Sequence, residues 1–293
     1  MSEATRARSG EGADGRRREL ARPPAPEPLP LPVVDNHTHL DIEDGDDLAD
    51  VEELLARAAA AGVPRAVQIG CDLPAARWTV QAVDEHPQLL GGVALHPNEV
   101  PALAEAGELD AAVAEIAELA RHPRVRVVGE TGLDHFRTPP EQWHLQEDSF
   151  RRHIRLAKEL GLALQIHDRD AHDDVLRVLA EEGAPERTVF HCFSGDAAMA
   201  RVCGDAGYYL SFAGNITFKN AGELREALRA APRDRLLVET DAPYLTPAPH
   251  RGRPNASYLV PVTVRAMAEV TGTDLERMCH LLQCATEEVY GTW

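Results

Sequence analysis

Histidine and carboxylate residues recur in this sequence directly after short apolar segments. The six best candidates for metal ligands are His37, His39, Glu130, His167, His191 and Asp241. Imidazole and carboxylate groups in this mixture suit Zn²⁺, Mn²⁺ or Mg²⁺. His37 and His39 are separated by one intervening residue, so in an extended strand both side chains point to the same side. Buried polar groups cost free energy unless they are paired or bind a metal, so the recurrence predicts a metal centre.

This ligand set is larger than one catalytic ion requires, because such an ion usually takes about three or four protein ligands. Two divalent ions bridged by a carboxylate would use all six, and Glu130 is the candidate bridge. We expect the ions to acidify a water molecule that Asp241 orients or deprotonates. His96 is expected to line the site without binding metal. Asp134 is expected either to fix a histidine tautomer or only to cap its loop.

The segments before these residues alternate with stretches of helical periodicity. Strands are expected over residues 33–36, 66–70, 91–95, 125–129, 163–166, 188–190, 208–212 and 236–239. Helices are expected over residues 48–61, 75–86, 109–121, 141–160, 171–182, 197–206, 221–231, 258–271 and 274–290. Continuous apolar strands indicate parallel pairing under helices on both faces.

Eight such units predict an α/β fold, a closed (β/α)8 TIM barrel of the metallo-dependent hydrolase type. Its C-terminal strand ends would bring the ligands to one face. A doubly wound open sheet is the alternative, although no GxGxxG motif follows the first strand. Residues 1–30, rich in charged residues and then proline, are expected to be a disordered N-terminal tail. Residues 31–293 are expected to form a single barrel domain.

Composition limits the classes of function. The chain of 293 residues has a formal net charge of −18, which argues against a protein that coats nucleic acid electrostatically. It does not exclude a nuclease, because bound metal ions supply positive charge locally. No apolar run is long enough for a membrane span, and the five cysteines show no CxxC spacing. We therefore expect a reduced cytoplasmic enzyme with no membrane association and no obligate protein partner.

Several longer motifs occur in a recognisable order: DNHTHLD, LHP, VVGETGLDHFR, LALQIHDRDA, VFHCFSG, LSFAGNITFK and LLVETDAPYLTP. Together they resemble the TatD family of metal-dependent DNases in the amidohydrolase superfamily, over about residues 33–290. The resemblance implies a TIM-barrel phosphodiesterase, typically a 3′–5′ exonuclease on single-stranded or frayed DNA ends. It also places the family's ligands on the same six residues. Some family members are reported to deacylate D-aminoacyl-tRNA, so this ester substrate remains an alternative.

Phosphate contacts require donors near the strand ends. The candidates are Arg169, Asn215, Lys219, Arg251 and Arg253. For each of them a surface salt bridge is an equal alternative. Tyr244 or Phe193 could stack a terminal base, with core packing as the competing role.

Three other readings stay open at this point. The first is an ester or amide hydrolase, although relatives of that kind bridge their metals with a carboxylated lysine where this chain has Glu130. The second is an inactive barrel that only binds, which the complete ligand set disfavours. The third uses Cys192 as a thiol nucleophile beside His191.

Overall fold

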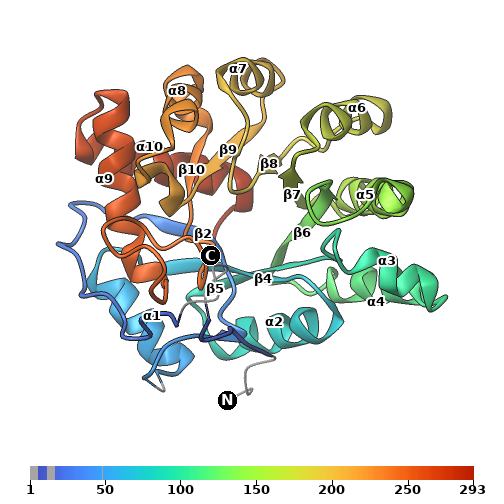
Figure 1. Cartoon of the computed structure of the whole chain (residues 1–293), viewed down its shortest axis with the longest axis horizontal. Helices are drawn as coiled ribbons and strands as arrows, with labels where there is room; N and C mark the ends of the chain where they lie inside the picture. The colour runs from blue at the N-terminus through green and yellow to red at the C-terminus, as the bar shows by residue number, and fades with distance from the viewer. Residues whose placement is uncertain (1–5, 12–16, 48) are drawn as a thin grey trace.

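The computed structural model describes residues 6–11, 17–47 and 49–293. Its centre is an eight-stranded sheet whose neighbouring strands are parallel and follow chain order. The strands are β2 (Val34–Thr38), β4 (Arg65–Gly70), β5 (Leu89–Val93), β6 (Val125–Asp134), β7 (Ala163–Arg169), β8 (Thr188–Phe190), β9 (Tyr209–Phe212) and β10 (Leu236–Val238). Figure 1 shows them arranged around a centre with helices outside.

The first and last strands of this sheet meet along a seam. A parallel bridge joins Thr38 to Ala242. The buried carboxylate of Asp35 on β2 accepts hydrogen bonds from the Thr240 N–H at 2.9 Å and the Thr240 hydroxyl at 2.6 Å. These contacts curl the sheet into a nearly closed barrel, which confirms the predicted TIM-barrel class and excludes the doubly wound open sheet.

The barrel is covered by helices that lie close to the predicted ranges. They are α1 (Val51–Ala60), α2 (Leu73–Glu85), α3 (Val100–Glu105), α4 (Leu109–Leu119), α5 (Trp143–Leu160), α6 (His172–Glu182), α7 (Ala197–Asp205), α8 (Gly222–Ala230), α9 (Val260–Thr271) and α10 (Leu275–Tyr290). Short 3₁₀ helices are η1 (Pro140–Gln142), η2 (Gly214–Thr217), η3 (Arg233–Arg235) and η4 (Ser257–Leu259). None of the described helices is long and apolar enough to cross a membrane.

Local sequence explains where many of these helices begin and end. The side chains of Asp50, Asp72 and Asp196 accept hydrogen bonds from the first turns of α1, α2 and α7. Gly161 and Gly272 end α5 and α9 in the left-handed conformation, with φ of 62° and 63°. The unpredicted α3 spans only six residues, too few for its periodicity to be recognised.

The N-terminal segment differs from the expected disordered tail over its described residues, 6–11 and 17–30. β1 (Arg6–Ala7) pairs in parallel with β3 (Ile42–Glu43). Leu29 is buried in the main core, and the Tyr258 hydroxyl donates to the Pro23 carbonyl at 2.6 Å. The proline-rich run thus packs against the barrel, because Leu29 is buried in the core and Pro23 accepts a hydrogen bond from Tyr258. Residues 1–5 and 12–16 lie outside the described part of the chain.

His153 on α5 gives the fold a pH-sensitive buried group. Its ring is fully buried, donates from Nδ1 to the Ser149 carbonyl at 2.7 Å, and accepts from the Leu95 N–H at 3.2 Å. Burial lowers the pKa of His153 to about 4. An unfolded histidine has a pKa of about 6.5, so below that pH the unfolded state binds more protons and stability falls.

We therefore expect His153→Gln to reduce the pH dependence of stability. The wild type should lose about 2 kcal/mol of unfolding free energy through this one group between pH 7 and pH 5. Glutamine keeps an acceptor for the Leu95 N–H but does not titrate in this range. Urea unfolding of both proteins at the two pH values measures the difference. Identical pH dependence in the two proteins would show that His153 is not the group responsible.

Candidate metal centre

The structure brings all six predicted ligands together at the C-terminal end of the barrel strands. His37 and His39 come from β2 and its end, Glu130 from β6, and His167 from β7. His191 follows β8, and Asp241 follows β10. The β2–β10 seam fixes part of this arrangement, because the Asp241 N–H donates to the His37 carbonyl at 2.9 Å. The His39 N–H likewise donates to the Ala242 carbonyl at 2.8 Å.

Glu130 lies between two groups of ligand atoms. Its Oε1 atom is 3.5 Å from His37 Nε2 and 3.6 Å from His39 Nε2. Its Oε2 atom is 2.8 Å from His191 Nε2 and 3.0 Å from His167 Nδ1. Each carboxylate oxygen therefore faces a different pair of histidines, which is the placement needed for a bridging ligand.

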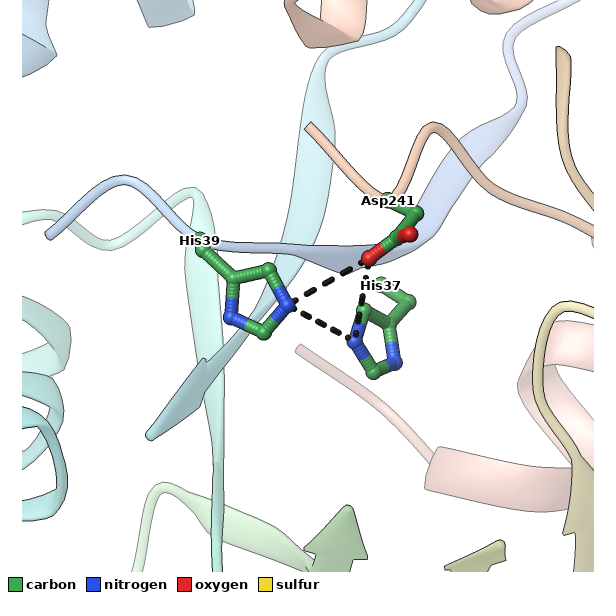
Figure 2. A group of neighbouring side chains, drawn as sticks. All are labelled: His37, His39 and Asp241. Atoms are coloured by element: carbon green, nitrogen blue, oxygen red, sulfur yellow. Dashed lines mark hydrogen bonds and ion pairs between the residues drawn. The ribbon is translucent and has the colours of Figure 1, made fainter. Parts of the chain in front are cut away.

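Figure 2 shows the first of these groups, in which two imidazoles and a carboxylate converge. His37 Nε2 and His39 Nε2 are 3.1 Å apart. Asp241 Oδ1 is 3.4 Å from His39 Nε2 and 3.8 Å from His37 Nε2. Ligand atoms about 2.0–2.2 Å from one shared ion are separated by roughly 3–4 Å, so this donor set fits a divalent metal. Glu130 belongs to further candidate groups, one with His37 and His191 and another with His96 and His167.

A glycine allows β6 and β7 to approach closely beside this site. Gly132 has a φ of 143°, and a Cβ atom there would lie 2.1 Å from the His167 carbonyl oxygen. Any side chain would push the strands apart and separate Glu130 from His167.

Hydrogen bonds from the barrel interior orient the two β2 histidines. His37 Nδ1 lies 2.7 Å from the side-chain oxygen of Gln165, whose amide group donates to the Tyr290 hydroxyl at 3.1 Å. His39 Nδ1 lies 3.0 Å from the Ile69 carbonyl oxygen. Since these oxygens can only accept from the imidazoles, both rings carry a proton on Nδ1 and turn their Nε2 atoms toward the site.

Carboxylates orient the rings of the other two histidines, His167 and His191. Glu239 Oε1 lies 3.2 Å from His191 Nδ1 and accepts from the Cys192 N–H at 2.8 Å. Asp134 Oδ2 lies 3.2 Å from His167 Nε2, so the His167 nitrogen that faces Glu130 is Nδ1. Asp134 also accepts from the Arg137 N–H at 2.8 Å. Asp134 therefore contacts both the histidine and the backbone of its own loop.

Ionisation of these groups follows from their neighbours. Burial raises the pKa of the Asp134 carboxyl, but hydrogen bonds from His167, the Arg137 N–H and Asn98 outweigh it and hold that pKa well below its usual range. His96 accepts from the Asn98 N–H at its Nδ1 atom, at 3.0 Å. Its Nε2 faces Glu130 Oε2 at 3.7 Å, and His96 also forms a candidate ligand group with Glu130 and His167.

Sequence reasoning missed Gln165 and Glu239 as parts of this site. The positions of both residues in the predicted strands could have identified them. Gln165 precedes His167 by two residues on one strand, so the two side chains share a face. Glu239 stands at the end of the eighth predicted strand and is fully buried, with Oε2 lacking a hydrogen-bond partner among the described residues. A buried carboxylate of this kind suits charge interaction with a histidine that could bind a cation.

We expect Glu239→Gln to weaken metal binding about tenfold or more, because the carboxylate partner makes the His191 ring more basic. Competition with a chromogenic chelator would measure the dissociation constant. Glu159→Gln, on the solvent face of α5, is the matched control. An unchanged metal affinity in Glu239→Gln would assign Glu239 to packing alone.

The thiol-nucleophile alternative finds no support in the surroundings of Cys192. Burial raises the pKa of this thiol well above its usual range, and the nearby carboxylates of Asp241, Glu239 and Glu130 add to the shift. The thiolate that such a mechanism needs is therefore disfavoured at neutral pH.

The predicted phosphate contacts divide into two groups. Arg169 and Arg251 lie over aromatic rings, 3.9 Å from the Phe136 ring centre and 4.4 Å from the Phe218 ring centre. Lys219 is exposed beyond η2. These three remain available to a ligand.

The other two predicted contacts are already engaged. The amide of Asn215 donates to Cys192 Sγ at 3.9 Å, and its buried Oδ1 has no partner among the described residues. Arg253 donates to the carbonyls of Ala21 and Arg22, each at 2.9 Å. The Arg253 guanidinium thus holds the N-terminal segment against the barrel.

The aromatic candidates also separate. Phe193 is buried in the core, whereas Tyr244 is 37% exposed and its ring centre lies 6.4 Å from that of His39. Phe136, which was not predicted, is 62% exposed.

Comparisons with known proteins agree with this architecture. The family model described as "TatD related DNase" matches residues 34–291. An "uncharacterized metal-dependent hydrolase TatD" of Mycobacterium tuberculosis is 47% identical, covering 88% of this chain and 98% of the relative. A protein of Klebsiella pneumoniae named "3′-5′ ssDNA/RNA exonuclease TatD" is 38% identical, covering 70% of this chain and 76% of the relative. The crystal structure of YJJV, a TatD homologue from Escherichia coli, superposes with a TM-score of 0.81 at 26% identity, covering 89% of this chain and 98% of that one.

Proposed function

This chain belongs to the TatD-related DNase family of metal-dependent hydrolases, and on that premise we propose that it hydrolyses phosphodiester bonds of DNA. The proposed substrate is the 3′ end of a single strand or of a frayed duplex, shortened stepwise as a 3′–5′ exonuclease. The name of the Klebsiella pneumoniae relative, which is 38% identical, supports this choice of reaction.

The observation that carries the proposal is the position of Glu130. Its two oxygens face separate ligand groups, which suits a bridge between two divalent ions such as Mg²⁺, Mn²⁺ or Zn²⁺. One group would be His37, His39 and Asp241, and the other would be His167 and His191, which both face Glu130 Oε2. When bound, such ions would neutralise charge on the phosphate oxygens and acidify a water molecule.

Asp241 is the residue best placed to handle the proton of that water. Its carboxylate borders both β2 histidines and keeps 16% of its side chain exposed. Burial raises its pKa, but His39, His37 and His191 outweigh burial and lower it, so the group is ionised at neutral pH. An ionised carboxylate at the edge of the site can accept a proton as the water attacks phosphorus in line. Arg169 and Arg251 would hold flanking phosphates.

The direction in which the protein shortens a labelled DNA strand tests the exonuclease proposal. Metal-free protein is incubated with single-stranded oligonucleotides labelled at the 3′ or the 5′ end, with Mg²⁺, Mn²⁺ or Zn²⁺ added in turn. We expect a ladder of 5′-labelled products shortened one nucleotide at a time, and a labelled mononucleotide from the 3′-labelled strand. Failure to cleave with every metal would reject the nuclease proposal. Release of the amino acid from D-aminoacyl-tRNA would then favour the ester hydrolase.

A further inference from the structure

The described N-terminal segment, residues 6–11 and 17–30, lies outside the stretch that the family model matches. It nevertheless reaches the edge of the candidate metal centre. Arg6 pairs with Ile42, three residues beyond the ligand His39. Figure 1 shows this dark-blue segment near α1 and β2. The pairing brings two arginines, Arg6 and Arg8, beside the chain that follows His39.

Arg6 lies on the β4 side of the site. Its Nη1 atom is 3.7 Å from Asp72 Oδ2, and its Nε atom is 3.9 Å from Asp41 Oδ2. Asp72 follows Cys71, whose Sγ atom is 3.2 Å from Glu130 Oε1. The arginine side chain keeps 38% of its surface exposed, and both contacts are longer than hydrogen bonds. The guanidinium therefore borders the centre while keeping surface available to a ligand.

Arg8 lies on the β10 side. It donates to the Pro243 carbonyl and, at 3.2 Å, to Asp44. Its guanidinium carbon is 4.8 Å from the centre of the Tyr244 ring. That ring is partly exposed and in edge contact with His39. Arg8 and Tyr244 thus form a cationic and aromatic surface next to a proposed metal ligand.

We propose that Arg6, Arg8 and Tyr244 form a subsite for the strand that leads to the cleaved bond. The two guanidinium groups would bind its phosphates, and Tyr244 would stack one of its bases. Carboxylates line this edge at Asp41, Asp44 and Asp72, in a chain whose net charge is −18, so a polyanion needs local cations to approach here. The inference rests on the proposed function and extends its substrate to a strand of several nucleotides.

The double variant Arg6→Gln/Arg8→Gln tests this subsite. Its affinity for fluorescein-labelled dT12 is measured by anisotropy at several salt concentrations, and its turnover is measured on dT12 and on the dinucleotide dTpdT. We expect about tenfold weaker binding of dT12. The slope of log affinity against log salt should fall by about 1.4, because two phosphate contacts are lost. The loss of kcat/KM should be about tenfold greater on dT12 than on dTpdT, which is too short to span the subsite.

Two further variants separate binding from folding. Arg6→Lys/Arg8→Lys keeps both charges and should restore most of the salt slope. Arg121→Gln/Arg155→Gln removes two exposed arginines, one in the turn after α4 and one on α5, and should change neither binding nor turnover. Melting temperatures report whether each variant folds.

The outcomes distinguish failure of the proposed subsite from failure of the proposed nuclease function. If the wild type cleaves dT12 and the Gln/Gln variant matches it in affinity and salt slope, the subsite is rejected and the nuclease proposal stands. If the wild type neither binds nor cleaves dT12 with any metal, the nuclease proposal fails and the subsite fails with it.

Discussion

Glu130→Gln is expected to lower the metal-dependent hydrolysis rate by at least about 10³-fold. The amide keeps the size of the side chain but loses the charge and one of the two oxygens that face separate ligand groups. Each ion is worth several kcal/mol of transition-state stabilisation, and about 1.4 kcal/mol corresponds to a factor of ten in rate. Plasma mass spectrometry of dialysed protein should show metal content falling from two equivalents to one or fewer.

The control for this variant is Glu159→Gln, which removes a carboxylate from the exposed face of α5. It should keep the metal content and the rate of the wild type. Glu130→Gln also relieves a cluster of buried charges, so we do not expect it to unfold the protein once metal is removed. A Glu130→Gln protein that binds two ions and turns over normally would contradict the bridging role.

Asp241→Asn is expected to lower kcat by about 10²–10⁴-fold, the range for losing a general base. Asparagine can still offer an oxygen to the β2 histidines, but it cannot accept a proton. The backbone of this residue should stay in place, because its N–H donates to the His37 carbonyl independently of the side chain. Rapid-quench turnover of a labelled oligonucleotide, with metal content measured in parallel, distinguishes loss of proton transfer from loss of bound metal.

For Asp241→Asn the informative outcome is the combination of both measurements. Retained metal with a low kcat supports proton transfer by Asp241. Lost metal with a kcat that returns when excess metal is added would assign Asp241 to ligation alone.

Strand ends explain why so much of the site could be predicted from the sequence. In a parallel barrel, residues that follow buried apolar strands converge on one face, so His37, Glu130, His167, His191 and Asp241 could be assembled without knowing any contact. The same reasoning predicted all eight strands to within a few residues.

Other features depend on contacts that periodicity does not encode. Gln165 and Glu239 contact the Nδ1 atoms of two candidate ligands, His37 and His191, and only the packed structure shows which ring nitrogen each contacts. The N-terminal segment reads as disordered by composition. In the structure, carboxylates near residue 44 and the loop around Arg253 give its arginines and carbonyls partners far away in sequence.

The most direct test of the two-metal account is a titration of metal-free protein with Mn²⁺, following both binding and oligonucleotide hydrolysis. The account predicts two binding events, with hydrolysis rising as the second equivalent binds and disappearing on addition of a chelator. Full hydrolysis after one equivalent, or hydrolysis in metal-free protein, would contradict it.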